Sequence, residues 1–188
     1  MIHPKITKKY VPKYTRMNTY GKLIDAQTLQ FERLLPGPIE KVWEYITEAE
    51  KRRLWFCDGT SGRQEGDHFT FVFHNSTLGE PPVPTPEKYT DFGDGYESQA
   101  VVVKAEKPTL FVIEWEGIVT FRLEEVGEQV LLTLTHEKLQ DSKGTRVGTL
   151  AGWHTHLDLL MTICHGQKPE SFWPAHMAHE DEYAKRVD

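Results

Sequence analysis

Apolar residues near the C-terminal end of the chain recur with the spacing of one face of a helix. Residues 152–160 read GWHTHLDLL. The apolar stripe through this segment comprises Leu150, Trp153, Leu157, Leu160, Met161 and Cys164. Spacings of three and four residues are typical of an amphipathic α-helix. Such a helix needs a surface to cover its apolar face, so we expect it to lie on a sheet, with Cys164 as a small buried thiol.

The first part of the chain predicts one long strand followed by two short helices. Residues 23–35 alternate between apolar and polar side chains, which places Leu29, Phe31 and Arg33 on one side of a strand. Pro36-Gly37-Pro38 ends that strand, and Pro38 suits a first helical turn. The first helix is expected to end near Thr47.

The apolar face of that first helix is formed by Ile39, Val42, Trp43 and Ile46. A second helix is predicted over residues 48–54, with Thr47 as its N-cap and Glu50 three residues further on.

The middle of the chain predicts a succession of strands. Residues 68–75 place Phe69, Phe71 and Phe73 on one face of a strand, and that face should be buried. Further strands are expected over residues 97–105, 109–116, 119–126 and 129–137. Short connections imply antiparallel neighbours. The Pro-rich residues 76–95 resemble an insertion loop, and the whole order indicates an α+β fold.

Length and composition suggest one globular domain. The chain has 188 residues, which we divide into an N-terminal arm (1–21), one domain (22–167) and a C-terminal tail (168–188). A net charge of −6 argues against nucleic acid as a partner. No apolar run is long enough to span a membrane. The basic N-terminal residues lack the apolar core of a signal peptide, so we expect a cytoplasmic protein with two reduced cysteines, Cys57 and Cys164.

Four segments in this order resemble one known family. They read PGPIEKVWEYITEAEKRRLWF, EKPTLFVIEWEG, VTFRLEEVGEQVLLTLTHEKL and AGWHTHLDLL. Together they are similar to the activator-of-Hsp90-ATPase homologue 1-like family of the START and Bet v 1-like (SRPBCC) superfamily, over roughly residues 24–167. The chain departs from the family pattern in the loop 76–95, the N-terminal arm, and the tail with its Phe172-Trp173-Pro174.

The resemblance implies a helix-grip fold, in which a curved antiparallel sheet wraps around the long C-terminal helix and encloses a cavity. The C-terminal helix and the concave side of the sheet should line this cavity. The expected ligand-binding residues are Trp153, Leu157, Leu160, Met161, Phe71, Phe73, Trp115, His154 and Glu114. Phe69, Phe111 and Phe121 are further aromatic candidates, because the sequence leaves open which face of each strand is concave.

Polar candidates within these segments allow two interpretations. His154 and Asp158 are four residues apart on the predicted helix, which suits either an oriented base or an ordinary exposed pair. His156 should lie further round the helix, nearer to solvent. Glu114 and Glu116 flank Trp115 and are either surface charges or, on a concave face, a buried acid. Arg122 or Arg33 could pair with that acid.

We expect no metal and no cofactor. His154 and His156 would point in directions roughly 200° apart on a helix, so they cannot easily chelate one ion. His176 and His179 could do so if residues 175–186 are helical, but no further ligand is fixed beside them by the sequence. The chain also lacks the motifs of known nucleophilic or phosphate-binding sites.

Three function classes therefore remain. The first is binding of a small hydrophobic or amphipathic ligand in the cavity. The second is a co-chaperone or protein-interaction module that contacts a chaperone, and the third is a cyclase- or hydrolase-type enzyme, which we favour least. The protein would act as a monomer or a homodimer. The Phe172-Trp173-Pro174 segment could cover the cavity mouth or pair with a second chain.

Overall fold

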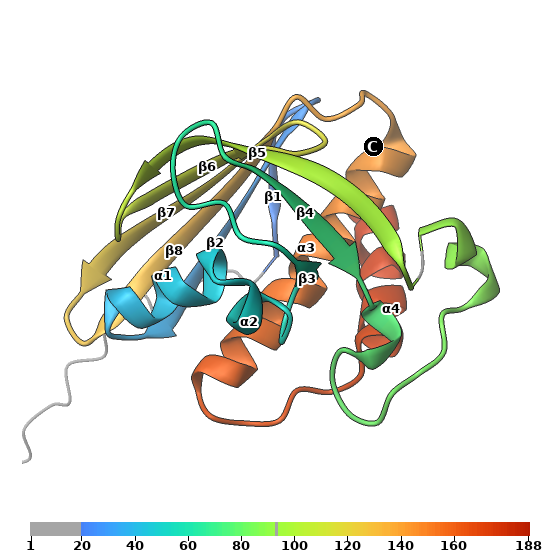
Figure 1. Cartoon of the computed structure of the whole chain (residues 1–188). Coiled ribbons are helices and arrows are strands. Elements are labelled where there is room, and N and C mark those ends of the chain that lie inside the picture. Colours follow the sequence, from blue (N-terminus) through green and yellow to red (C-terminus); the bar gives the residue numbers. More distant parts are fainter. Residues whose placement is uncertain (1–19, 93) are drawn as a thin grey trace, which may run out of the picture.

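A long helix lies on one curved antiparallel sheet in the computed structural model, which describes residues 20–92 and 94–188 (Figure 1). The sheet has eight strands in the order β1-β2-β8-β7-β6-β5-β4-β3. They are β1 (Lys22–Asp25), β2 (Thr28–Pro36), β3 (Asp58–Gly59), β4 (His68–Phe73), β5 (Tyr96–Glu106), β6 (Leu110–Glu114), β7 (Ile118–Val126) and β8 (Gln129–Glu137). This arrangement confirms the predicted α+β fold. The expected N-terminal arm falls outside the described residues except for Tyr20 and Gly21.

The predicted first strand is in fact two strands. β1 and β2 form a hairpin whose turn is stabilised by the side chain of Asp25, which accepts a hydrogen bond from the backbone N–H of Gln27 at 2.8 Å. An aspartate that bonds to the backbone two residues later is a common turn device, and it interrupts the apparent alternation. Within β2, Leu29, Phe31 and Arg33 are buried on one face, as predicted.

The two short helices follow β2 as expected. The first, α1 (Ile39–Thr47), ends at the predicted residue and buries its apolar face, whereas α2 (Ala49–Arg52) is shorter than predicted. Thr47 does not cap α2. Its hydroxyl donates instead to the carbonyl of Trp43 at 2.9 Å, one turn back in α1, and Glu48 occupies the N-cap position.

Strands β4 to β8 are neighbours in chain order, and the connections from β5 to β8 are short, as predicted, whereas the long loop 74–95 joins β4 to β5. Phe69, Phe71 and Phe73 are all buried on the face of β4 that is turned toward the helices. On β6 and β7, Phe111 and Phe121 face the same interior. The aromatic residues of the sheet therefore form one continuous inner surface.

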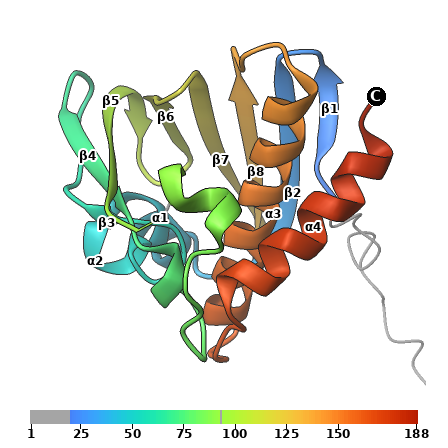
Figure 2. The same cartoon turned by 90° about the vertical axis from the view of Figure 1, so that its right-hand side faces the viewer.

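The long helix α3 (Lys143–Cys164) is buried on more than one side. Its predicted stripe is buried, with Met161 only partly so, and the Ser142 side chain caps its start by accepting from the N–H of Thr145 at 3.0 Å. A second helix, α4 (Phe172–Arg186), crosses the face of α3 that is turned away from the sheet (Figure 2). The sheet and α4 together enclose α3, so residues on opposite sides of α3 are both buried.

The start of α4 is fastened to the loop that follows β4. Backbone hydrogen bonds join Glu80 to Pro169 and Phe172 to Leu78, and the loop contains the short helical turns η2 (Asn75–Thr77) and η3 (Glu87–Phe92). Gly79 makes this contact possible. Its φ is +79°, and a Cβ there would lie 2.0 Å from the carbonyl oxygen of Glu170. The loop and the tail therefore form one connected layer over the sheet and α3.

Candidate functional site

A cavity of about 660 Å³ lies between the sheet, α3, α4 and the loop after β4. It is lined by Phe56, Phe73, Asn75, Lys88, Tyr89, Tyr96, Trp115, Glu116, His136, Leu139, Gln140, Thr145, Gly148, Thr149, Gly152, Trp153, His156, Phe172, Trp173, His176 and Glu180. The loop and the tail supply one wall. Phe172 and Trp173 are each only 2% exposed and belong to this wall.

Aromatic rings form the apolar wall of the cavity. Phe56 stacks on Trp153 with ring centroids 5.0 Å apart, and Phe73 stacks on Trp115 at 5.9 Å. Phe56 also meets Trp115 edge to face at 5.6 Å, which joins the two stacks. The Trp115 indole N–H donates to the hydroxyl of Ser98 at 2.9 Å, so that ring is held in place. The wall presents flat, fixed surfaces to anything inside the cavity.

A buried histidine fixes the remaining tryptophan. The indole N–H of Trp153 donates to Nδ1 of His136 at 3.1 Å. Because Nδ1 is the acceptor, the neutral ring carries its hydrogen on Nε2, which donates to the carbonyl oxygen of Glu116 at 3.2 Å. Burial lowers the pKa of His136 to about 4, so this chain of hydrogen bonds is intact at neutral pH.

Charged and phenolic groups gather where η3 meets α4. The carboxylate of Glu180 accepts hydrogen bonds from the Tyr89 hydroxyl and the Lys88 ammonium group, each at 2.5 Å. Burial opposes ionisation of Glu180, but these two bonds hold the pKa of its carboxyl below the ordinary value. Tyr89 in turn stacks on Trp173 at 4.8 Å. The loop and the tail thus build a polar end to an otherwise aromatic cavity.

Unused hydrogen-bonding capacity is concentrated in this part of the cavity wall. Within the described residues, five buried side-chain nitrogen or oxygen atoms have no hydrogen-bond partner. Three of them belong to cavity-lining residues: Oδ1 of Asn75, Nε1 of Trp173 and Nδ1 of His176. Leaving such groups unpaired costs about 1–3 kcal/mol each. A wall of this kind is suited to a ligand that carries hydrogen-bonding groups.

Two glycines leave open space along α3. Gly148 and Gly152 both line the cavity, and a Cβ built at either position meets nothing within 4 Å. No close packing therefore requires glycine at these positions. Glycine within a helix costs about 1 kcal/mol relative to alanine. Glycine at positions 148 and 152 therefore lowers the stability of α3, and the absence of side chains there leaves room inside the cavity.

The structure divides the expected ligand-binding residues into two groups. Phe73, Trp115 and Trp153 line the cavity. The other six do not line it: Leu157, Leu160, Met161, Phe71, His154 and Glu114. Phe71, Leu157 and Leu160 are fully buried in the core, and Met161 packs at its margin. Phe69, Phe111 and Phe121 are core residues as well.

Of the two glutamates that flank Trp115, Glu116 lines the cavity and Glu114 does not. β6 ends at Glu114, whose side chain is exposed, and the chain then turns through Glu116 with φ of 48° and Gly117 with φ of 133°. This turn breaks the alternation that would have kept the two glutamates on one face. Glu116 accepts a hydrogen bond from the Tyr96 hydroxyl at 3.0 Å. The glycine after Glu116 was the signal in the sequence that could have revealed the turn.

His156 is buried, not near solvent as predicted. It is 5% exposed, lines the cavity, and donates from Nδ1 to the carbonyl oxygen of Trp55 at 2.8 Å. Burial lowers its pKa to about 3. The expectation of exposure failed because it considered only the contact of α3 with the sheet, whereas α3 is enclosed on several sides.

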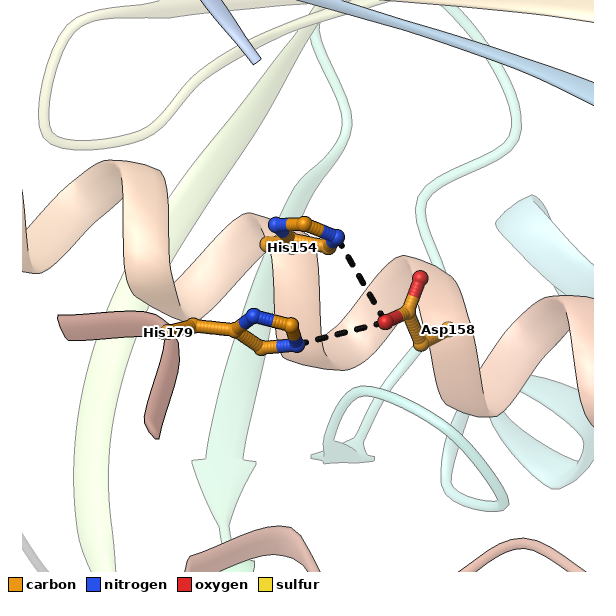
Figure 3. A group of neighbouring side chains, drawn as sticks. All are labelled: His154, Asp158 and His179. Carbon is orange, nitrogen blue, oxygen red and sulfur yellow. Dashed lines mark ion pairs between the residues drawn. The ribbon is translucent and has the colours of Figure 1, made fainter. Parts of the chain in front are cut away.

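His154 and Asp158 meet groups that the sequence did not connect to them. His154 lies on the side of α3 that faces α4, where its Nδ1 is 3.0 Å from the hydroxyl of Tyr183. Asp158 pairs with the buried guanidinium of Arg33 at 3.3 Å, so Arg33 is the partner of Asp158 and not of Glu114 or Glu116. His179 of α4 completes this cluster, and its Nε2 lies 3.2 Å from Asp158 Oδ2 (Figure 3).

The described helices, including α3, give no candidate for a membrane span. A sheet curved over a long helix, with a cavity between them, defines a helix-grip domain of the α+β class. The chain belongs to the activator of Hsp90 ATPase homolog 1-like family, whose model matches residues 36–164. No curated protein matches the chain.

Solved structures share this fold. A protein from Bordetella parapertussis, determined by NMR, is 35% identical with a TM-score of 0.74, and the match covers 90% of this chain and 91% of that one. CalU16 from Micromonospora echinospora is 20% identical with a TM-score of 0.61, over 88% and 93% of the two chains. The Aha1 dimer from Colwellia psychrerythraea is 15% identical with a TM-score of 0.57, over 73% and 95%. The last two similarities concern the fold alone.

Proposed function

We propose that the protein binds a small amphipathic molecule in the cavity between the sheet, α3 and α4. The observation that carries this proposal is the pair of glycines Gly148 and Gly152, which keep the cavity open although no packing contact requires them. A volume of about 660 Å³ lies within the range of small-molecule sites, which is about 300–1,000 Å³.

The lining suggests how such a molecule is oriented. Its apolar body would lie against the rings of Phe56, Phe73, Trp115 and Trp153. A polar group would face the end built by the loop and the tail, where Glu180 and the unpaired side-chain atoms lie. Flat aromatic walls with a few polar groups at one end favour a planar or ring-containing ligand with hydrogen-bonding substituents.

Filling the cavity from α3 tests the proposal. Gly152→Leu places a side chain into open space, so it should occupy the cavity without a clash and should keep the thermal stability or raise it. Binding of anilinonaphthalene sulfonate, measured by fluorescence titration, should weaken by more than about tenfold, since the probe and the new side chain compete for the same volume. Native mass spectrometry of the wild-type protein should also reveal a retained small molecule.

The matched control is Gly144→Leu. Gly144 lies in the same helix outside the cavity lining, and its Cβ would meet only Ser142 Oγ at 4.0 Å. This variant should bind the probe as the wild-type protein does. Equal probe binding by the wild-type protein and a folded Gly152→Leu variant would overturn the proposal, because the cavity would then not be where the molecule binds.

A further inference from the structure

A second cluster of chemically active side chains lies outside the cavity, between α3 and α4. His154 and Asp158 come from α3 and His179 comes from α4, and Figure 3 shows both imidazole rings directed at the same carboxylate. One ligand atom from each residue lies within 4.8 Å of the others. This is the largest such grouping of histidine and acidic side chains in the described chain, and the ligand-binding proposal makes no use of it.

Two of the three distances between ligand atoms are close to those of a metal site. Asp158 Oδ2 lies 3.5 Å from His154 Nε2 and 3.2 Å from His179 Nε2. In a tetrahedral zinc site with bonds of about 2.0–2.1 Å, neighbouring ligand atoms are about 3.3 Å apart. The ligand nitrogens of the two histidines lie within 4.8 Å of each other. Their rings are stacked nearly parallel, with an interplanar angle of 12° and centroids 3.8 Å apart, and each nitrogen lone pair lies in its ring plane. Binding of one ion therefore requires the partly exposed His179 ring to turn toward it.

Neighbouring groups would orient the ligands. The hydroxyl oxygen of Tyr183 lies 3.0 Å from His154 Nδ1 and already accepts a hydrogen bond from the backbone N–H of Gly21 at 2.7 Å. With the imidazole hydrogen on Nδ1, that nitrogen donates to the same oxygen, and Nε2 is free to coordinate. Metal-binding histidines are commonly held in this way through their second nitrogen.

Arg33 determines which carboxylate oxygen of Asp158 is available to an ion and which kind of ion the site favours. Its guanidinium, 1% exposed, pairs with Asp158 Oδ1 at 3.3 Å, which leaves Oδ2 directed at the two histidines. The positive charge of Arg33 offsets the single negative charge of Asp158, so attraction of a cation must come mainly from the imidazoles. Imidazole ligands favour zinc, cobalt, nickel and copper ions over magnesium and calcium.

Access to the cluster is open. The side chains of Asp158 and His179 are 44% and 21% exposed, whereas His154 is 3% exposed. An ion can therefore reach the two outer ligands from solvent and contact the inner one last. Three protein ligands leave a position for water, as in zinc sites that are not closed by a fourth side chain.

We propose that His154, Asp158 and His179 bind one divalent transition-metal ion that links α3 to α4. The test uses the full chain, freed of metal with a chelator and titrated with zinc chloride in a calorimeter. We expect a heat of one-to-one stoichiometry, and titration with cobalt chloride should produce a visible absorption band of the coordinated ion. Magnesium chloride should give no specific heat.

Two variants locate the site. His179→Gln changes a partly exposed residue of α4, so the fold should persist, and zinc affinity should fall by more than about tenfold. His165→Gln removes an exposed histidine at the end of α3 that is not in the cluster, and this variant should keep the wild-type affinity. Absence of a stoichiometric zinc heat in the wild-type protein would overturn the proposal. So would unchanged affinity in a folded His179→Gln variant, whose helix content circular dichroism would verify.

Discussion

The indole nitrogen of Trp153 on α3 and Nδ1 of His136 on β8 are 3.1 Å apart and share a hydrogen bond within the cavity wall. His136 in turn donates a hydrogen bond from Nε2 to the backbone carbonyl of Glu116, which fixes the orientation of its ring. Helix, strand and turn are therefore connected through one neutral imidazole. Protonation of Nδ1 would remove the acceptor that holds the Trp153 indole.

Acid should weaken the fold through His136. Its folded pKa of about 4 lies below the ordinary value of 6.5, so between these two pH values the unfolded chain binds a proton at this histidine and the folded protein does not. The stabilisation is therefore fully present above pH 6.5 and is lost as the pH falls toward 4, by about 3 kcal/mol in total. Urea denaturation at several pH values should show a smaller acid-dependent loss for His136→Gln than for the wild-type protein.

The control for this experiment is the exposed His74, whose replacement by Gln should leave the wild-type curve unchanged. If the stability of His136→Gln runs parallel to that of the wild-type protein over pH 4 to 7, His136 does not carry the effect.

Removing the charge of Asp158 should destabilise the protein. Asp158→Asn leaves the buried guanidinium of Arg33 without its counterion, while Arg33 Nε already lacks a partner. We expect a loss of about 1–3 kcal/mol in the free energy of unfolding, less than for a fully buried pair because the Asp158 side chain is 44% exposed. Chemical denaturation measures this loss.

An exposed ion pair provides the comparison for Asp158→Asn. Glu50 and Arg53 lie 3.1 Å apart with side chains 83% and 52% exposed, so Glu50→Gln should change stability by less than about 0.5 kcal/mol. Similar losses in both variants would show that the burial of Arg33 has no special consequence.

Core and cavity residues of α3 should respond differently to truncation. Leu157 is 0% exposed and outside the cavity lining, so Leu157→Ala should cost about 2–5 kcal/mol of stability and leave the probe affinity of the folded protein unchanged. Met161→Ala, on the same helix but only partly buried, should cost less. Thermal denaturation and fluorescence titration separate the two effects, and a selective loss of probe binding in Leu157→Ala would contradict the assignment of Leu157 to the core.

The contact between Gly79 and the start of α4 should tolerate no side chain. Gly79→Ala combines a positive φ with a Cβ 2.0 Å from the Glu170 carbonyl oxygen, so the loop and the tail must separate. Gly66 has a similar φ of +88°, but a Cβ there meets open space. Gly66→Ala should therefore lower the free energy of unfolding only by the conformational penalty of a left-handed residue, about 1–2 kcal/mol. Hydrogen exchange of α4 should accelerate in Gly79→Ala alone, and equal exchange in the two variants would show that the close approach is unimportant.

Local patterns predicted most of the fold. The spacing of Leu150, Trp153, Leu157 and Leu160 identified α3, and alternation identified β4 to β8, because both periodicities depend on residues close in sequence. The prediction of one long first strand was wrong because a turn at Asp25 lies within a segment of alternating apolar and polar residues. The prediction that Thr47 caps the second helix was wrong because its hydroxyl donates to a backbone carbonyl of α1.

The candidate site was harder to predict than the fold. Trp115, Phe73 and Trp153 could be placed at the cavity through the family resemblance, but Tyr89 and Glu180 belong to a loop and a tail separated by 91 residues. Nothing in either segment indicates that they meet. The same holds for His154 and His179, whose proximity depends on how α4 crosses α3.

Part of the cavity wall lies outside the family match. The match spans residues 36–164, whereas Phe172, Trp173, His176 and Glu180 follow it. A comparison restricted to the matched segment therefore leaves out four residues that line the cavity.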